Sequence, residues 1–132
     1  MDLIYKLHVE DRYQVIVMGI GQGGNFALEL ATQTPAISAT FIFYASLFVK
    51  PAAFSRIQGP VFGFYGEKDP TTQTIASTSK YMRANGKTFQ PIVYEGADYG
   101  FMNSGRARGQ ETFNQQAMEA ASRRLFQLVS SL

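Results

Sequence analysis

The sequence predicts an α/β protein with a parallel sheet of about four strands and helices on both faces. Four short apolar runs, rich in β-branched and aromatic residues, occur along the 132 residues. Segments with apolar residues at helical spacing separate these runs. Each run is also bounded by glycine, proline or polar residues, which are typical of turns. Strands that alternate with helices form parallel sheets, because each helix returns the chain to the edge where the next strand starts.

The first half of the chain is predicted to form a helix over residues 2–11, a strand over 14–19, a helix over 24–33 and a strand over 39–44. The first helix is indicated by apolar residues that recur at helical spacing. The first strand lacks polar alternation, which is typical of a strand covered on both faces. Pro35 prevents the second helix from continuing.

The second half is predicted to form a strand over residues 61–66, a helix over 72–85, a strand over 89–94 and a helix over 110–130. Gly86 is expected to end the third helix, because glycine is favoured just past a helix C-terminus. Pro91 cannot donate a ladder hydrogen bond, so the fourth strand is expected at an edge of the sheet. The last helix follows a period of 3.6 residues.

Composition narrows the classes of function. The net charge of +2 gives no support for binding to nucleic acid or to a charged membrane surface. The absence of cysteine excludes disulfides, thiolate chemistry and cysteine-ligated metal. No stretch reaches the ~18 apolar residues of a membrane span, and the N-terminus lacks the apolar centre of a signal peptide. We expect one cytoplasmic domain over residues 1–132 that needs no cofactor and binds neither nucleic acid nor membrane.

Residues 13–31 are the most distinctive stretch of the chain. An apolar, β-branched run leads into four glycines within six positions, and a helical pattern follows at once. A strand, a sharp turn and a helix make a nucleophile elbow, whose apex residue points its side chain into an active site. In the pattern G-x-nucleophile-x-G, the apex falls on Gly21. The turn is therefore typical of a catalytic site, whereas the attacking atom is missing.

Three turns are expected at the same edge of the sheet, after the first, third and fourth strands. Their segments GIGQGGNFALELA, PVFGFYGEKDP and VYEGADYGF resemble the C-terminal half of the dienelactone hydrolase family of α/β-hydrolases. That family has G-x-Cys-x-G-G at its elbow, an Asp in a G-x-x-D-P turn and a His in a stretch like Y-x-G-A-x-H-x-F. The resemblance covers nearly the whole chain. It implies a truncated α/β-hydrolase fold.

The resemblance places the family's nucleophile at Gly21, its acid at Asp69 and its base at Tyr99. Nucleophilic catalysis needs an attacking hydroxyl or thiolate, a base that accepts its proton and an acid that orients the base. Glycine has no attacking atom, and a phenol is a poor general base at pH 7. The first hypothesis is therefore an impaired or inactive dienelactone-hydrolase-like protein with a degenerate triad and a binding or interaction role. As structural alternatives, Asp69 caps the next helix and Tyr99 fills the vacated space.

Several parts of the family's site have no clear counterpart here. The family's N-terminal strands, and the loop that supplies the second oxyanion amide, are absent, although the Gln22 amide could serve as the first donor. The family's substrate-carboxylate arginine falls at Asn103, with Arg106 and Arg108 further along, so no substrate-binding residue is assigned. The elbow strand is expected at the open side of the sheet. An unpaired apolar edge invites pairing, so we expect a homodimer or higher oligomer that covers Val15 to Met18.

Two alternatives remain open. One is an active, carboxymethylenebutenolidase-like hydrolase of small esters or lactones, with unfamiliar residues or with groups from a partner chain; Ser46 is a conceivable replacement nucleophile, and His8, the only histidine, is expected to be structural. The other is anion or nucleotide binding at residues 19–24, which spell G-x-G-x-x-G. The acidic residue that would hold a ribose is missing, since no Asp or Glu occurs between Glu29 and Glu67.

Overall fold

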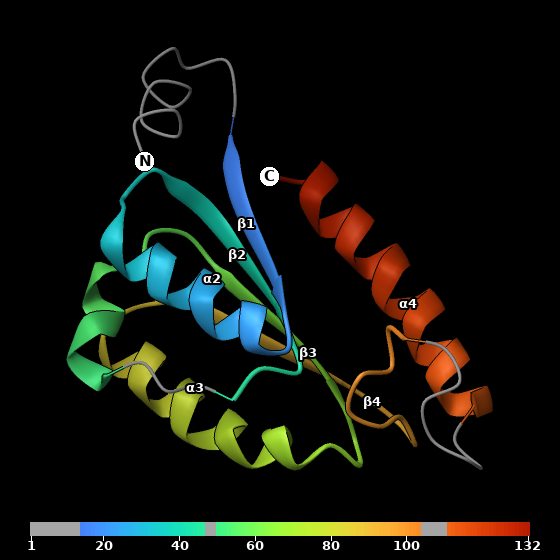
Figure 1. The fold of residues 1–132 in the computed structure, drawn as a ribbon. Coiled ribbons are helices and arrows are strands. Elements are labelled where there is room, and N and C mark those ends of the chain that lie inside the picture. Colours follow the sequence, from blue (N-terminus) through green and yellow to red (C-terminus); the bar gives the residue numbers. More distant parts are fainter. Residues whose placement is uncertain (1–13, 47–49, 104–110) are drawn as a thin grey trace.

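The protein forms a four-stranded parallel sheet in the computed structural model, which describes residues 14–46, 50–103 and 111–132 (Figure 1). The four strands are β1 (Val15–Ile20), β2 (Ile37–Phe43), β3 (Val61–Gly66) and β4 (Phe89–Tyr94). They lie side by side in chain order, and each neighbouring pair is parallel. The fold class predicted from the sequence is therefore confirmed.

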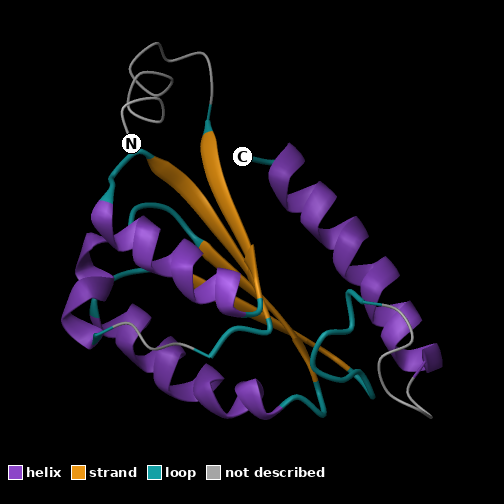
Figure 2. Cartoon of the chain, viewed as in Figure 1, coloured by secondary structure: helices purple, strands orange, loops and turns teal. Residues whose placement is uncertain are grey.

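The helices of the described residues are α2 (Gln22–Gln33), η1 (Pro51–Arg56), η2 (Pro70–Thr74), α3 (Ile75–Ala84) and α4 (Glu111–Ser130), where η denotes a 3-10 helix. They cover both faces of the sheet (Figure 2). Apolar residues of α2, α3 and η1 pack against one face, and those of α4 pack against the other. The sheet is thus the middle layer of three.

The two central strands, β2 and β3, supply most of the core on the α4 side. Phe41 stacks on Phe62 with ring centroids 5.1 Å apart, and Phe43 stacks on Phe64 at 4.6 Å. Both pairs are direct cross-strand neighbours in the register. Because all four rings are almost fully buried, the centre of the sheet is held by close aromatic pairs, a favourable arrangement across neighbouring strands.

Strand β1 differs from its expectation. The sequence predicted a strand covered on both faces, whereas Met18 is 51% exposed and Ile20 is 45% exposed. The reason is that β1 is an edge strand and that α4 packs mainly over β2 and β3. The prediction of two-sided coverage is therefore wrong for β1. Its position at the open side of the sheet agrees with the expectation for the elbow strand.

The remaining elements follow the prediction with local changes. Strand β4 lies at the other edge, as Pro91 indicated. The helix predicted over residues 72–85 is divided into η2 and α3. The helix predicted over residues 2–11 lies outside the described residues. Within the described part of the chain, no helix is both long and apolar enough to cross a membrane.

Candidate active site

The turns that follow β1, β3 and β4 all lie at the carboxyl edge of the sheet, which is where ligands bind in open α/β sheets. Gly21 stands between β1 and α2 with φ 61° and ψ −125°, a backbone conformation that side chains disfavour. Its N–H donates a hydrogen bond to the Phe43 carbonyl at 2.9 Å. The residue thus forms the sharp strand-to-helix apex that the sequence predicted.

The elbow depends on close contact between its strand and its helix. A Cβ atom added to Gly19 would lie 2.0 Å from the Gly23 carbonyl oxygen, and one added to Gly24 would lie 2.6 Å from the Ala45 Cβ. No real Cβ contact is that short, so both positions require glycine. Packing of α2 against β1 and β2 therefore accounts for two of the three glycines in the G-x-G-x-x-G pattern.

Tyr99 lies directly over the apex. A Cβ atom added to Gly21 would lie 2.9 Å from the Tyr99 hydroxyl oxygen. The Tyr99 ring packs on Tyr44 with ring centroids 4.9 Å apart, and Tyr44 in turn packs edge-on against Phe101 at 5.4 Å. The fold therefore brings the first and third predicted positions together, and the tyrosine hydroxyl lies in contact with the point where a nucleophile side chain would begin.

Tyr44, the residue on which the Tyr99 ring packs, has an unusual backbone conformation. Its φ of 39° is the one positive value among the described non-glycine residues, and its N–H donates to the Phe64 carbonyl at 2.7 Å. Such conformations carry strain that the surrounding structure must hold in place, and they cluster at ligand sites. The sequence analysis missed Tyr44, because no local pattern marks a tyrosine that adopts a positive φ.

Asp69 is 1% exposed and caps the start of η2. Its Oδ1 accepts the Thr71 N–H at 2.8 Å, and its Oδ2 accepts the Thr71 hydroxyl at 2.6 Å. Within the described residues, these two hydrogen bonds engage both carboxylate oxygens in the residue's own turn. The cap that the sequence offered as the structural alternative is therefore present. Thr71, two residues after the aspartate, occupies the carboxylate that would orient a catalytic base in a triad.

The carboxylate also affects a neighbouring phenol. Burial, and to a lesser extent the negative charge of Asp69, raise the pKa of Tyr65 well above its ordinary value. Tyr65 is fully buried at the end of β3, and its hydroxyl donates to the Ala45 carbonyl at 3.4 Å. The side chain therefore stays protonated at neutral pH and acts as a hydrogen-bond donor rather than as a base.

Two hydrogen bonds to neighbouring elements fix the loop that carries Tyr99. The Lys68 N–H donates to the Ala97 carbonyl at 2.9 Å, which joins the β3 turn to the β4 loop. The Asp98 N–H donates to the Oδ1 atom of Asn114 at 2.9 Å, which joins the same loop to α4. Asn114 is 1% exposed, and the sequence analysis did not single it out. Tyr99 is thus held by neighbours on both sides of its loop.

The other residues named from the sequence lie around this edge or outside the described part. Gln22 opens α2, where backbone N–H groups have no intrahelical acceptor, and Asn103 is exposed. Ser46 is half-buried just beyond β2. Three predicted residues lie outside the described residues, namely His8, Arg106 and Arg108.

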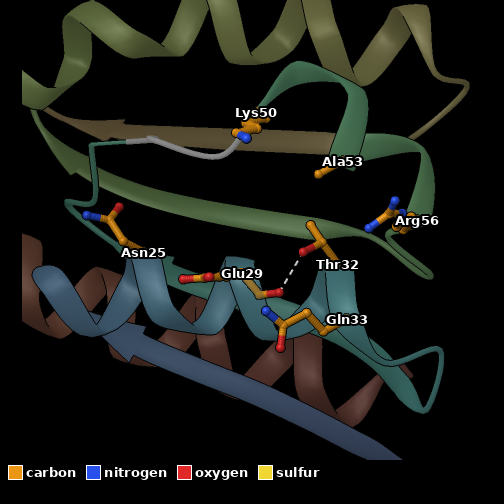
Figure 3. A pocket seen from close by; sticks show the side chains of 7 residues that line it. All are labelled: Asn25, Glu29, Thr32, Gln33, Lys50, Ala53 and Arg56. Carbon is orange, nitrogen blue, oxygen red and sulfur yellow. Dashed lines mark hydrogen bonds between the residues drawn. The ribbon is translucent and has the colours of Figure 1, made fainter.

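A pocket of about 310 Å³ lies between α2 and η1 (Figure 3), and none of the three triad positions lines it. Its wall on α2 includes Glu29 and Thr32, and the Thr32 hydroxyl donates to the Glu29 carbonyl at 2.6 Å. Its wall on η1 ends at Arg56, and exposed Lys50 lies just before that helix. The lining residues carry charges of both signs but include no serine, cysteine or histidine, so the pocket lacks the usual nucleophile and base of an acyl-transfer site.

Comparison with known proteins extends the match beyond these turns. The model of the dienelactone hydrolase family matches residues 3–132. A Saccharolobus solfataricus protein named "Putative carboxymethylenebutenolidase" is 31% identical over 117 residues, which make up 85% of this chain and 42% of that protein.

Solved structures show the same fold. A structure named m3DLH matches with a TM-score of 0.67 and 28% identity, covering 85% of this chain and 50% of that one. Thermogutta terrifontis esterase 2, solved after phosphorylation by paraoxon, matches with a TM-score of 0.58 and 23% identity, covering 86% of this chain and 54% of that one. The chain spans about half the length of these proteins or less. Since the family model covers nearly every residue, the chain belongs to the dienelactone hydrolase family.

Proposed function

We propose that this chain is a dienelactone hydrolase homologue that has lost hydrolytic turnover and acts by binding. The observation that carries the proposal is the 2.9 Å separation between the Tyr99 hydroxyl and the Cβ position of Gly21. In an elbow hydrolase, this is the space from which the nucleophile side chain reaches the substrate. Here it is closed by a residue that cannot attack an ester under ordinary conditions.

The other triad positions support the same proposal. Asp69 is committed to Thr71 as a helix cap, and the base position holds an aromatic ring packed on Tyr44. Removing a single member of a working triad lowers kcat by roughly 10⁴- to 10⁶-fold. With the attacking atom and the base both replaced, the retained carboxylate has no proton relay to serve.

The ligand that we propose is a small ester or lactone, or a molecule of that shape. Support comes from the family and from the name of the Saccharolobus relative. The N–H groups of Gln22 and Gly23 begin α2 and have no acceptor one turn earlier in the helix, so they suit a carbonyl oxygen bound above the elbow. Tyr99 is 41% exposed as a whole, and its hydroxyl beside Gly21 is a further possible donor to such a ligand.

We further propose that residues 1–132 form one domain whose elbow strand self-associates. The support is the position of β1 at the edge of the sheet and the exposure of Met18 and Ile20. An apolar edge strand without protection pairs readily with another strand.

Turnover of p-nitrophenyl acetate and of a simple butenolide tests the loss of hydrolysis. We expect the wild-type rate to equal that of the heat-denatured protein, because no group at position 21 can form an acyl-enzyme. Tyr99→Phe removes only the hydroxyl and is the matched variant. Wild-type turnover well above the denatured control, reduced by Tyr99→Phe or Asp69→Ala, would instead establish an active hydrolase that works with unfamiliar residues.

A further inference from the structure

Asn114 interrupts an otherwise apolar stripe along α4. The residues that this helix buries recur at helical spacing and so lie on one face, namely Asn114, Ala117, Ala121 and Leu128. Asn114 is 1% exposed, which makes it as deeply buried as its apolar neighbours. Asparagine is also a weaker helix former than alanine or leucine. The pattern of the helix thus favours an apolar residue at this position, and the amide there needs a physical reason.

The amide group of Asn114 is only half engaged. Its Oδ1 atom accepts the N–H of Asp98 at 2.9 Å, whereas its Nδ2 atom is buried without a hydrogen-bond partner among the described residues. Burying an amide donor without an acceptor is unfavourable. The side chain therefore destabilises the fold at one end and makes a single polar contact at the other. That contact, with the loop after β4, is what the amide contributes.

The contact with Asp98 lies one residue before Tyr99. The Tyr99 side chain is 41% exposed, so the core does not enclose it, and its hydroxyl oxygen lies 2.9 Å from the Cβ position of Gly21. Because packing constrains such a side chain on one side only, hydrogen bonds that fix its backbone decide where the hydroxyl lies. The Asp98 N–H is the fixed backbone group next to Tyr99.

We propose that Asn114 is a positioning residue, which holds Tyr99 over Gly21 through Asp98 and so sets the width of the ligand space above the elbow. This inference rests on the ligand site proposed above. The Oδ1 atom ties the loop to α4, and α4 is itself packed on the central strands. The amide thus transmits the position of a well-packed helix to the hydroxyl that closes the elbow.

Two other contacts of this loop compete with Asn114 for the same role. The Tyr99 ring packs on Tyr44, and the Gly96 N–H donates to the Oε1 atom of Glu67 at 3.0 Å. Packing on Tyr44 constrains the ring but not the backbone that precedes it. The Glu67 anchor lies earlier in the loop and belongs to an exposed residue. Asn114 is therefore the anchor that is both next to Tyr99 and immobilised by its own burial.

A double-mutant cycle between positions 21 and 114 tests the proposal, which couples these two positions through Tyr99. Gly21→Ala adds a Cβ atom that presses on the Tyr99 hydroxyl. Asn114→Leu keeps the branched shape of the side chain but removes the hydrogen bond to Asp98. We expect Gly21→Ala to shift the urea midpoint at most half as far in the Asn114→Leu background, since the released loop lets the phenol move away. The strain of alanine at a φ of 61° is common to both backgrounds and cancels.

Glu67→Met provides the matched control, because it removes the side-chain acceptor of the Gly96 N–H from the same loop. It should leave the shift caused by Gly21→Ala unchanged. Equal shifts in the wild-type and Asn114→Leu backgrounds, or an equal reduction by Glu67→Met, would overturn the proposal. The cycle measures stability alone, so hydrolysis by the wild type would contradict the proposed loss of turnover and leave this result unaffected.

Nitration of Tyr99 by tetranitromethane gives a second measurement that does not involve position 21. Fragment-ion mass spectra assign the nitrated residue among the tyrosines of the chain. We expect Asn114→Leu to be nitrated at Tyr99 severalfold faster than the wild type, because the released hydroxyl moves away from the elbow into solvent, whereas Glu67→Met should match the wild type. An unchanged rate at Tyr99 in folded Asn114→Leu protein would contradict the role assigned to Asn114.

Discussion

Gly19→Ala is expected to destabilise the protein by about 4 kcal/mol or more, in the range of the most damaging single substitutions. The added Cβ would lie 2.0 Å from the Gly23 carbonyl oxygen and 2.3 Å from its carbon. Because these atoms belong to the backbone of α2, no side chain can rotate away, and the helix must separate from β1. Urea unfolding followed by circular dichroism measures the loss.

Gly23→Ala is the matched control from the same turn. The elbow pattern treats both glycines alike, but a Cβ on Gly23 would meet nothing within 4 Å. Since Gly23 lies in the first turn of α2, alanine should leave stability unchanged or raise it by up to about 1 kcal/mol. Equal effects of the two substitutions would contradict the packing that we describe for the elbow.

Asp69→Ala is expected to lower the free energy of unfolding by about 2 kcal/mol, the upper range for the loss of an N-cap. The substitution removes the acceptor of the Thr71 N–H and of the Thr71 hydroxyl, both in a partly buried turn. Asp69→Asn keeps an oxygen for the N–H and should cost about half as much. Urea unfolding of both variants at pH 7 provides the measurement.

The same variants separate a cap from a catalytic acid. A cap changes stability and leaves any background hydrolysis unchanged, whereas an acid that orients a base changes kcat without a matching loss of stability. Asp69→Asn with wild-type stability and greatly reduced turnover would show that the carboxylate serves catalysis. That result would contradict the structural role assigned to Asp69.

The sequence could place the three turns at one edge because strand order and parallel pairing follow from alternating patterns. The Gly21–Tyr99 approach is a consequence of that topology. The hydrogen bond from Thr71 to Asp69 could also have been predicted, since a hydroxyl two residues after an aspartate commonly completes a turn. The positive φ of Tyr44 could not have been predicted, because it accompanies packing against Tyr99 and Phe101, which are distant in the sequence.

The error at β1 has a related cause. An apolar run without polar alternation is typical of a strand buried on both faces, but the run itself does not say whether the covering element is part of the same chain. In this protein α4 covers β2 and β3 and leaves Met18 and Ile20 exposed. The pattern of β1 therefore indicates that its side chains can be covered on both faces, and the self-association proposed above would supply the missing cover.

Covalent trapping tests the central claim most directly, namely that the elbow has no attacking group. Paraoxon phosphorylates at least one protein of this fold, as the solved structure of phosphorylated Thermogutta terrifontis esterase 2 shows, and that enzyme serves as the positive control. After incubation with paraoxon and intact-mass spectrometry, we expect the mass of this chain to stay unchanged while the control gains one adduct. A stoichiometric adduct on this chain, above all one mapped to Tyr99 or Ser46, would contradict the account.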